Sequence, residues 1–242
     1  MSPEPTVRQG DQAMRGAALA GFRVAIGVPL LLVSGGMLGF GALAHDSGFA
    51  SWEAVLASVV VWALPAQVVA TELHATGADL LAIAVAAALT SMRFFPMAVA
   101  LLPTFGRVGL AGRLAQSHLM SATSWAFLMR SAAPREPRAR LIYHTVFGLT
   151  CITAAAIATL GGWLGAAALP QPVALGLLFM NAAFFMVLLI DQRNRQALLA
   201  VASGTVLYGP IHAVLPEMAL LLAGVLGGSV AFLLGDRLRP RA

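Results

Sequence analysis

The sequence contains no lysine, a single cysteine and few charged residues of any kind. Charged side chains make up 10% of its 242 residues and hydrophobic ones 59%, with a mean hydropathy of +0.84. A soluble domain usually carries about 25% charged residues. This composition therefore excludes an ordinary soluble protein and predicts a polytopic membrane protein.

The lone cysteine and the lack of catalytic motifs restrict the chemistry. Cys151 lies within an apolar run, so an intrachain disulfide is excluded and no metal cluster is implied. The sequence contains no nucleophile elbow, no phosphate-binding loop and no HExxH zinc motif. We therefore expect no enzyme activity, no cofactor and no metal. An intramembrane protease that uses Ser124 and His144 on facing helices is the alternative left open.

All fifteen basic residues are arginines, and the pI is about 10.9. A high pI is also found in nucleic-acid-binding proteins, but these arginines lie mainly in loops and tails between apolar runs. Such a distribution is typical of membrane proteins, whose cytoplasmic loops are rich in basic residues. We expect the chain to lie in a lipid bilayer and to bind no nucleic acid.

Apolar segments follow one another along most of the chain. Several are long enough to cross a hydrocarbon core of about 30 Å, which takes about 20 helical residues. They lack strand-like alternation and are rich in Ala, Leu and Gly, which favours helices. The fourth segment is short, and in one alternative it enters the membrane without crossing it. The segments are 22–44, 52–74, 79–102, 117–130, 141–169, 173–190, 196–215 and 216–235.

The predicted fold is thus an all-α polytopic membrane protein with seven or eight hydrophobic helical segments, several of them broken by Pro or Gly. A stretch rich in Arg and Pro is predicted to be an aqueous loop that divides the membrane domain into two halves. The predicted divisions are a polar N-terminal segment 1–20, a single transmembrane domain 21–235 with halves of about 21–130 and 141–235, the loop 131–140, and a basic C-terminal tail 236–242.

Two orientations fit the arginine distribution. With eight crossings and a cytoplasmic N-terminus, twelve loop arginines face the cytoplasm, and Arg107 and Arg113 do not. With seven crossings and an external N-terminus, eleven face the cytoplasm. Both place the 131–140 loop and the C-terminal tail inside. We predict a multi-pass protein of the bacterial inner membrane with a cytoplasmic C-terminus, and the side of the N-terminus stays open.

Two glycine-rich stretches resemble one another. VSGGMLGFGALA (33–44) and TLGGWLGAAALP (159–170) agree at six of twelve positions. One interpretation is a repeat of two related halves, as in transporters whose broken helices line the substrate site. The alternative is that small residues allow helices to pack closely.

A permanent charge interrupts the third apolar segment. Arg93 lies about two-thirds along it, in LTSMRFFPMAV, where a charged side chain costs at least about 2.5 kcal/mol. Pro96 removes a backbone donor three residues later, so the stretch is a polar interruption of a spanning helix. We interpret Arg93 as part of a solute path. The alternative is a structural ion pair with Glu72 or Asp79.

Other segments carry similar interruptions. Pro65 breaks the second segment near its middle, and Gln67 places an amide just beyond the break. The first segment contains Pro29 and five glycines between positions 27 and 43. Asn181 lies near the centre of the sixth segment, where a packing role is equally compatible with the sequence.

Three motifs occur in the order in which one known family carries them. They are Arg23, Pro29, Gly39-Phe-Gly41 and Gly48 in the first region, then Pro65-Ala-Gln67, then Ser91-Met-Arg93-Phe94. With these motifs, the chain resembles the large subunit of the AzlC-like (azaleucine-resistance) branched-chain amino acid permeases. The resemblance covers about residues 20 to 150.

Two departures mark the chain as a divergent member. The family has Asn and His where this sequence has Ser91 and Phe94. Its Thr-Asp-Glu pattern corresponds to Ser121-Ala122-Thr123, so the acidic pair is missing. The resemblance implies export of branched-chain or other hydrophobic amino acids with a small AzlD-like membrane subunit. A scaffold or accessory subunit that transports nothing alone is the alternative. The residues expected to bind substrate are Arg93, Gln67, Ser91, Pro65, Gly39, Gly41, Asn181 and Thr123.

Overall fold

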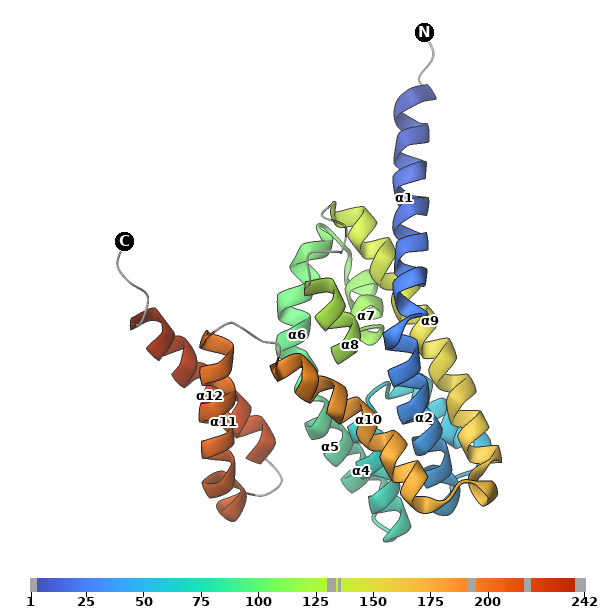
Figure 1. Cartoon of the computed structure of the whole chain (residues 1–242), viewed down its shortest axis with the longest axis vertical. Coiled ribbons are helices and arrows are strands. Elements are labelled where there is room, and N and C mark those ends of the chain that lie inside the picture. Colours follow the sequence, from blue (N-terminus) through green and yellow to red (C-terminus); the bar gives the residue numbers. More distant parts are fainter. Residues whose placement is uncertain (1–3, 130–133, 135, 191–194, 216–218, 238–242) are drawn as a thin grey trace. The chain divides into compact units, whose positions relative to one another are not determined.

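The computed structural model describes residues 4–129, 134, 136–190, 195–215 and 219–237, and all regular structure in this part is helical (Figure 1). The predicted all-α fold is therefore confirmed. Contacts divide the chain into unit 1, Met1–Asn181, and unit 2, Ala182–Ala242. Parts of the predicted 131–140 loop and of the C-terminal tail lie outside the described residues.

Unit 1 contains most of the helices, and the long helix α10 continues from it into unit 2. The elements are α1 (Glu4–Ala25), α2 (Val28–Asp46), α3 (Ser51–Val60), α4 (Leu64–Ala75), α5 (Leu80–Ser91), α6 (Phe94–Leu101), the short 3-10 helix η1 (Leu102–Phe105), α7 (Leu110–His118), α8 (Ala122–Met129), α9 (Pro137–Leu164), η2 (Ala166–Ala168), α10 (Gln171–Ile190), α11 (Arg195–Val214) and α12 (Ala219–Arg237).

Acidic side chains and prolines mark where several of these helices begin. Glu53 accepts the backbone N–H of Ala50 at 2.8 Å at the start of α3. Asp79 accepts two backbone N–H groups at the start of α5, and Glu136 does the same for α9. A carboxylate satisfies N–H groups that have no partner within the helix and interacts favourably with its dipole.

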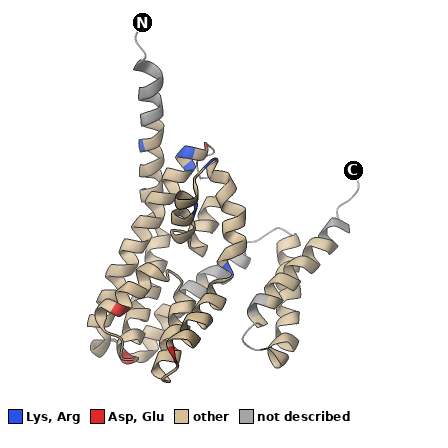
Figure 2. Cartoon of the chain, turned by 180° about the vertical axis from the view of Figure 1, so that it is seen from behind, with Lys and Arg blue, Asp and Glu red and all other residues tan. Residues whose placement is uncertain are grey.

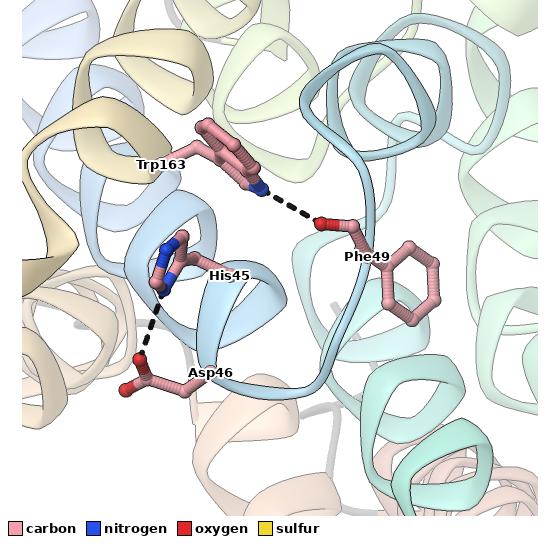
Figure 3. A network of polar contacts seen from close by, with 4 residues as sticks. All are labelled: His45, Asp46, Phe49 and Trp163. Atoms are coloured by element: carbon pink, nitrogen blue, oxygen red, sulfur yellow. Dashed lines mark hydrogen bonds and ion pairs between the residues drawn. The ribbon is translucent and has the colours of Figure 1, made fainter.

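Unit 1 is organised around α9, which runs in the same direction as α1 and α2. A Cβ atom at Gly21 in α1 would overlap the carbonyl oxygen of Tyr143, near the start of α9. At the other end, the indole Nε1 of Trp163 donates to the carbonyl oxygen of Phe49 at 2.8 Å (Figure 3). Residue numbers increase in the same direction along α1–α2 and along α9, so these helices are parallel. The chain between α2 and α9 must therefore return to the end of unit 1 where α9 begins.

Glycines bring the backbones of α2 and α9 into contact. A Cβ atom at Gly41 would overlap the carbonyl oxygen of Thr159, and one at Gly162 would overlap that of Leu38. The two similar glycine-rich stretches therefore pack against one another. This is the close packing that the sequence offered as the alternative to a repeat. The division of the membrane domain into two related halves stays a prediction.

The second apolar segment forms a hairpin rather than a crossing. α3 and α4 are separated by a break at Val61–Ala63, where Trp62 has a φ of +48°. The ring of Phe49, just before α3, lies 4.5 Å from the ring of His74, in the last turn of α4. Because the two ends of this segment are neighbours, residues 51–75 enter unit 1 and return to the same end.

The third apolar segment is a bent pair of helices. α5 and α6 join at Met92–Arg93, and the bend between α5 and the α6–η1 stretch is 48°. α5 begins at Leu80, close to the end of α4. Beyond α6, the ring of Phe105 lies 5.2 Å from that of His144 in the first third of α9. Residues 80–105 thus run from the end where α9 finishes to the end where it begins.

A second hairpin enters unit 1 from the opposite end to the first. A Cβ atom at Gly106, just before α7, would lie 3.1 Å from the side chain of Pro137 at the start of α9. The hairpin then descends until Leu119 contacts Gly148. On the way back, a guanidinium nitrogen of Arg140 donates to the carbonyl oxygen of Leu128 at 2.6 Å. The fourth apolar segment therefore enters unit 1 and returns to the same end, which is one of the two alternatives that the sequence left open.

Fewer segments qualify as crossings than the sequence predicted. Within the described residues, the helices long and apolar enough to span a membrane are Val28–Asp46, Pro137–Leu164 and Gln196–Val214, and the bent stretch 80–105 is a fourth if it counts as one span. The predicted seven or eight crossings are not confirmed, because two of the apolar segments are hairpins and, among the described residues, Gln171–Met180 and Leu222–Leu234 are shorter apolar helices.

Unit 2 is dominated by the antiparallel pair of α11 and α12. The hydroxyl group of Ser203 in α11 donates to the carbonyl oxygen of Gly227 in α12 at 2.9 Å. A Cβ atom at Gly227 would lie 2.5 Å from the backbone nitrogen of Gly204. Glycine again allows two helix backbones to approach closely.

Charge is distributed unequally between the two ends of unit 1 (Figure 2). The end where α9 begins, called the arginine end, carries Arg107 beside Gly106 and Arg138 and Arg140 in the first turn of α9. Glu136, the cap of α9, is an acidic exception there. The opposite end, called the acidic end, carries Asp46, Glu53, Glu72 and Asp79. Basic residues favour the cytoplasmic side, so we expect the arginine end to face the cytoplasm.

The first prediction concerns the glycine contact between α2 and α9. Gly162→Ala places a methyl group against the carbonyl oxygen of Leu38, and we expect overpacking to lower stability by about 1–3 kcal/mol. The neighbouring Gly161 meets nothing within 4 Å, so Gly161→Ala is the matched control: it shares the gain in helix propensity of up to about 1 kcal/mol and should not lower stability. Thermal unfolding in detergent measures both, and equal midpoints would contradict the proposed contact.

The second prediction concerns the α3–α4 hairpin. In a Cys151→Ala background, Ser47→Cys and Thr76→Cys flank the hairpin, and Arg107→Cys reports on the opposite end. A membrane-impermeant maleimide applied to intact cells should label the first two positions, and Arg107→Cys only after permeabilisation. If residues 51–75 crossed the membrane, Ser47→Cys and Thr76→Cys would label from opposite sides.

Candidate substrate site at the helix breaks

Three buried polar side chains meet where α3, α4 and α9 pack together. The hydroxyl groups of Ser58 and Thr159 lie 2.7 Å apart, and Nε2 of Gln67 donates to Ser58 Oγ at 3.2 Å. Ser58 also lies 3.1 Å from the carbonyl oxygen of Ala54, so its hydroxyl hydrogen has an acceptor within its own helix. Each of the three side chains is at most 1% exposed. This network fixes the α3–α4 hairpin to α9.

The same hairpin leaves two buried polar atoms without a partner. Gln67 Oε1 accepts no hydrogen bond, and Trp62 Nε1 donates none. Leaving a buried donor or acceptor unpaired costs about 1–3 kcal/mol. Trp62 also has a left-handed backbone conformation, which is strained for a bulky residue and is found most often at functional sites. The hairpin therefore offers a free acceptor and a free donor to a ligand.

The break also exposes a helix N-terminus inside the protein. α4 begins at Leu64, its cap residue Ala63 supplies no side-chain hydrogen bond, and Pro65 occupies the first turn. Ala63 and Ala66 are 3% and 0% exposed, so this turn is deep in unit 1. Free N–H groups and the helix dipole make such a terminus attractive to an anionic group.

Arg93 lies at the second break, between α5 and α6. Its guanidinium carbon is 5.2 Å from the centre of the Phe94 ring, and its Nε atom is buried without a hydrogen-bond partner. Neither acid proposed as its structural partner pairs with it among the described residues. Asp79 accepts two backbone N–H groups of α5, and Glu72 is exposed. The guanidinium group is therefore available to an anion.

The two breaks lie at about the same depth. α4 and α5 each contain 12 residues, pack against one another and are joined by the short connection Thr76–Asp79. Each arm of this antiparallel pair is therefore about 18 Å long. The far ends of the two arms, Leu64 and Ser91, are equally distant from the connection, so the two breaks lie at a similar depth. Gln67 lies about one turn nearer to the connection than its break, and Arg93 lies two residues beyond the end of α5.

The remaining predicted residues have different surroundings. Gly41 packs against α9 at Thr159, next to the Ser58–Gln67 network, whereas Gly39 packs against α10. Ser91 ends α5, and Thr123 is buried in α8. In the part of the chain that the structure describes, no hydrogen bond joins Thr123 or Arg93 to Gln67. Asn181 lies in α10, and its side chain is outside the described set.

Comparison with known families adds to this geometry. A family model described as AzlC protein matches residues 29–169, which is more than half of the chain. The chain belongs to the AzlC family. This family is associated with branched-chain amino acid transport and is a family of transporters rather than enzymes. The matched range of this AzlC chain extends from α2 to η2 and contains both hairpins. Searches of curated proteins and of solved structures found no match.

Sequence reasoning missed several polar groups of this AzlC protein. Ser58 and Thr159 are isolated hydroxyl residues in apolar runs, 101 positions apart, and no sequence motif connects them. A second buried pair links the α7–α8 hairpin to α9. Nδ1 of His144 lies 2.6 Å from Oε1 of Gln116 in α7. Ser124 bonds with Ser121 instead of His144, so the structure gives no support to a Ser–His protease.

Proposed function

We propose that this AzlC protein exports branched-chain or other hydrophobic amino acids across the bacterial inner membrane, together with a small AzlD-like subunit. The observation that supports this most is the pair of helix breaks at a common depth. One break carries a free amide oxygen on Gln67, and the other carries an unpaired guanidinium group on Arg93. An amino acid brings one group that is complementary to each.

In the proposed binding mode, Arg93 receives the substrate carboxylate. A guanidinium group matches a carboxylate with two parallel hydrogen bonds, and such a pair is favourable and geometrically selective in a low dielectric. The pairing would offset part of the cost of keeping Arg93 within the membrane. The free N–H groups at the start of α4 add positive potential in the same region.

The substrate ammonium group is assigned to Gln67. Its Nε2 atom already donates to Ser58, so Oε1 is the end that remains free to accept a hydrogen bond. Gly36 of α2 packs directly against the side chain of Leu64, so α2 lies close beside the start of α4. Ser91, Pro65, Gly39, Gly41, Asn181 and Thr123 remain proposed contributors to the site or to its walls.

The two hairpins suit transport by alternating access. α3–α4 enters from the acidic end and α7–α8 from the arginine end, so each covers the interior of unit 1 from one side. Helix breaks within a membrane are tolerated where they are buried in protein or line a cavity. Broken helices whose N-termini point at anionic substrate groups are a recurrent feature of secondary transporters. The competing proposal is a scaffold or accessory subunit that moves no solute.

The third prediction tests the function directly. Cells that produce this chain together with its small partner should lose preloaded labelled leucine, valine or isoleucine faster than cells that carry an empty vector. The chain without the partner and the partner without the chain are the controls. If no combination changes the flux of any hydrophobic amino acid, transport is refuted and the accessory role is favoured.

The fourth prediction tests Arg93. Lysine keeps the charge but loses the two-pronged geometry, so Arg93→Lys should reach the membrane in normal amounts and transport at least about tenfold more slowly, which corresponds to about 1.4 kcal/mol. Glu72→Ala, which removes the exposed acid once considered as its partner, is the matched control and should transport normally. Wild-type flux from a well-expressed Arg93→Ala protein would exclude Arg93 from the substrate site.

A further inference from the structure

His144 differs from the other histidines of the chain. It is 0% exposed, whereas His45, His74, His118 and His212 are all exposed. It lies on α9 beneath α7 and η1, with its ring 5.2 Å from that of Phe105. The proposed substrate site does not use it.

A chain of hydrogen bonds determines which ring nitrogen of His144 carries a hydrogen. The hydroxyl group of Thr145 donates to the carbonyl oxygen of Leu141 at 2.9 Å, so its oxygen accepts from Nε2 of Gln116, also at 2.9 Å. Oε1 of Gln116 is then the acceptor for Nδ1–H of His144 at 2.6 Å. In the neutral ring, Nε2 is left with a free lone pair and no partner.

In this arrangement, a protonated His144 would have no counter-ion. Glu136, the cap of α9, accepts two backbone N–H groups at the start of that helix. Among the described side chains of the elements packed around His144, the charged or titratable groups are Arg138, Arg140, Tyr143 and Cys151 on α9, Arg113 and His118 on α7, and Arg15 and Arg23 on α1, and η1 and α8 carry none. None of these is a carboxylate. An imidazolium would also bury an Nε2–H group without an acceptor. Protonation of the ring therefore requires a different arrangement, in which Nε2–H meets water or an acceptor.

We propose that His144 is the proton-binding residue that couples amino acid transport to a proton gradient. Nε2 takes up one proton from water in one conformation of the α7–α8 hairpin and releases it to water in another. The step forms and breaks a single N–H bond and involves no redox change. The two conformations would differ in proton affinity, which is the requirement for coupling. This inference rests on the proposed transport function.

The experiment uses the full chain with its small partner in proteoliposomes, with labelled leucine outside and a pH-sensitive dye inside. In the wild type, a pH gradient should drive net leucine flux, and proton flux should accompany it. Asparagine keeps a donor for Gln116 but cannot bind a proton. His144→Asn should therefore retain leucine exchange at equal pH and lose pH-driven net flux by about tenfold or more. The exposed His118→Asn is the matched control and should behave as the wild type.

A second variant keeps the proposal testable if His144→Asn reaches the membrane poorly. Gln116→Glu places a carboxylate beside the ring, which should shift the midpoint of the pH profile of transport upward by about one unit or more. A purely structural role predicts no such shift. Normal pH-driven flux through His144→Asn, or wild-type leucine flux that ignores the pH gradient, would overturn the proton site while leaving transport intact. Absence of any leucine flux in the wild type would instead refute the proposed function.

Discussion

The close parallel contact between α2 and α9 is the constraint on which the rest of unit 1 depends. Lipid tails are as apolar as leucine, so helices in a membrane associate through packing and hydrogen bonds rather than by burying surface from water. Gly41 and Gly162 allow that packing to reach backbone contact. The same turn of α9 presents Thr159 to Ser58, and Ser58 holds Gln67. The position of the α3–α4 hairpin therefore follows from the glycine contact.

A hairpin inside a membrane requires surroundings that a crossing helix does not require. Its break leaves backbone N–H and C=O groups that lipid cannot satisfy, so it must be surrounded by protein or by water. Trp62 and Gln67 meet this condition by burial, yet each keeps one polar atom unpaired. Natural structures pair nearly all such atoms. A polar ligand would account for the unpaired donor and acceptor at one break and for the unpaired guanidinium group at the next.

Composition and local chemistry were sufficient to predict the helical membrane class, the breaks at Pro65 and Arg93, and the importance of the glycines. They were not sufficient to predict the path of the chain. Residues 51–75 are as apolar as a crossing segment. Hydropathy reports the length and polarity of a segment, but not whether its second half continues across the membrane or turns back. The reversal depends on Trp62, a residue type that gives no turn signal, and on a bond from Ser58 to Thr159, 101 positions away.

The unbroken length of α9 gives the two polar centres a common support. Gln67 is linked to this helix through Ser58 and Thr159, and Gln116 is linked to it through His144 and Thr145. The first hairpin reaches α9 from the acidic end and the second from the arginine end. Over the 15 residues from His144 to Thr159 a helix rises about 22 Å, so the two polar centres do not touch one another. Coupling between substrate and proton would therefore require movement of the hairpins against a rigid α9, with each movement remaking hydrogen bonds on the same helix.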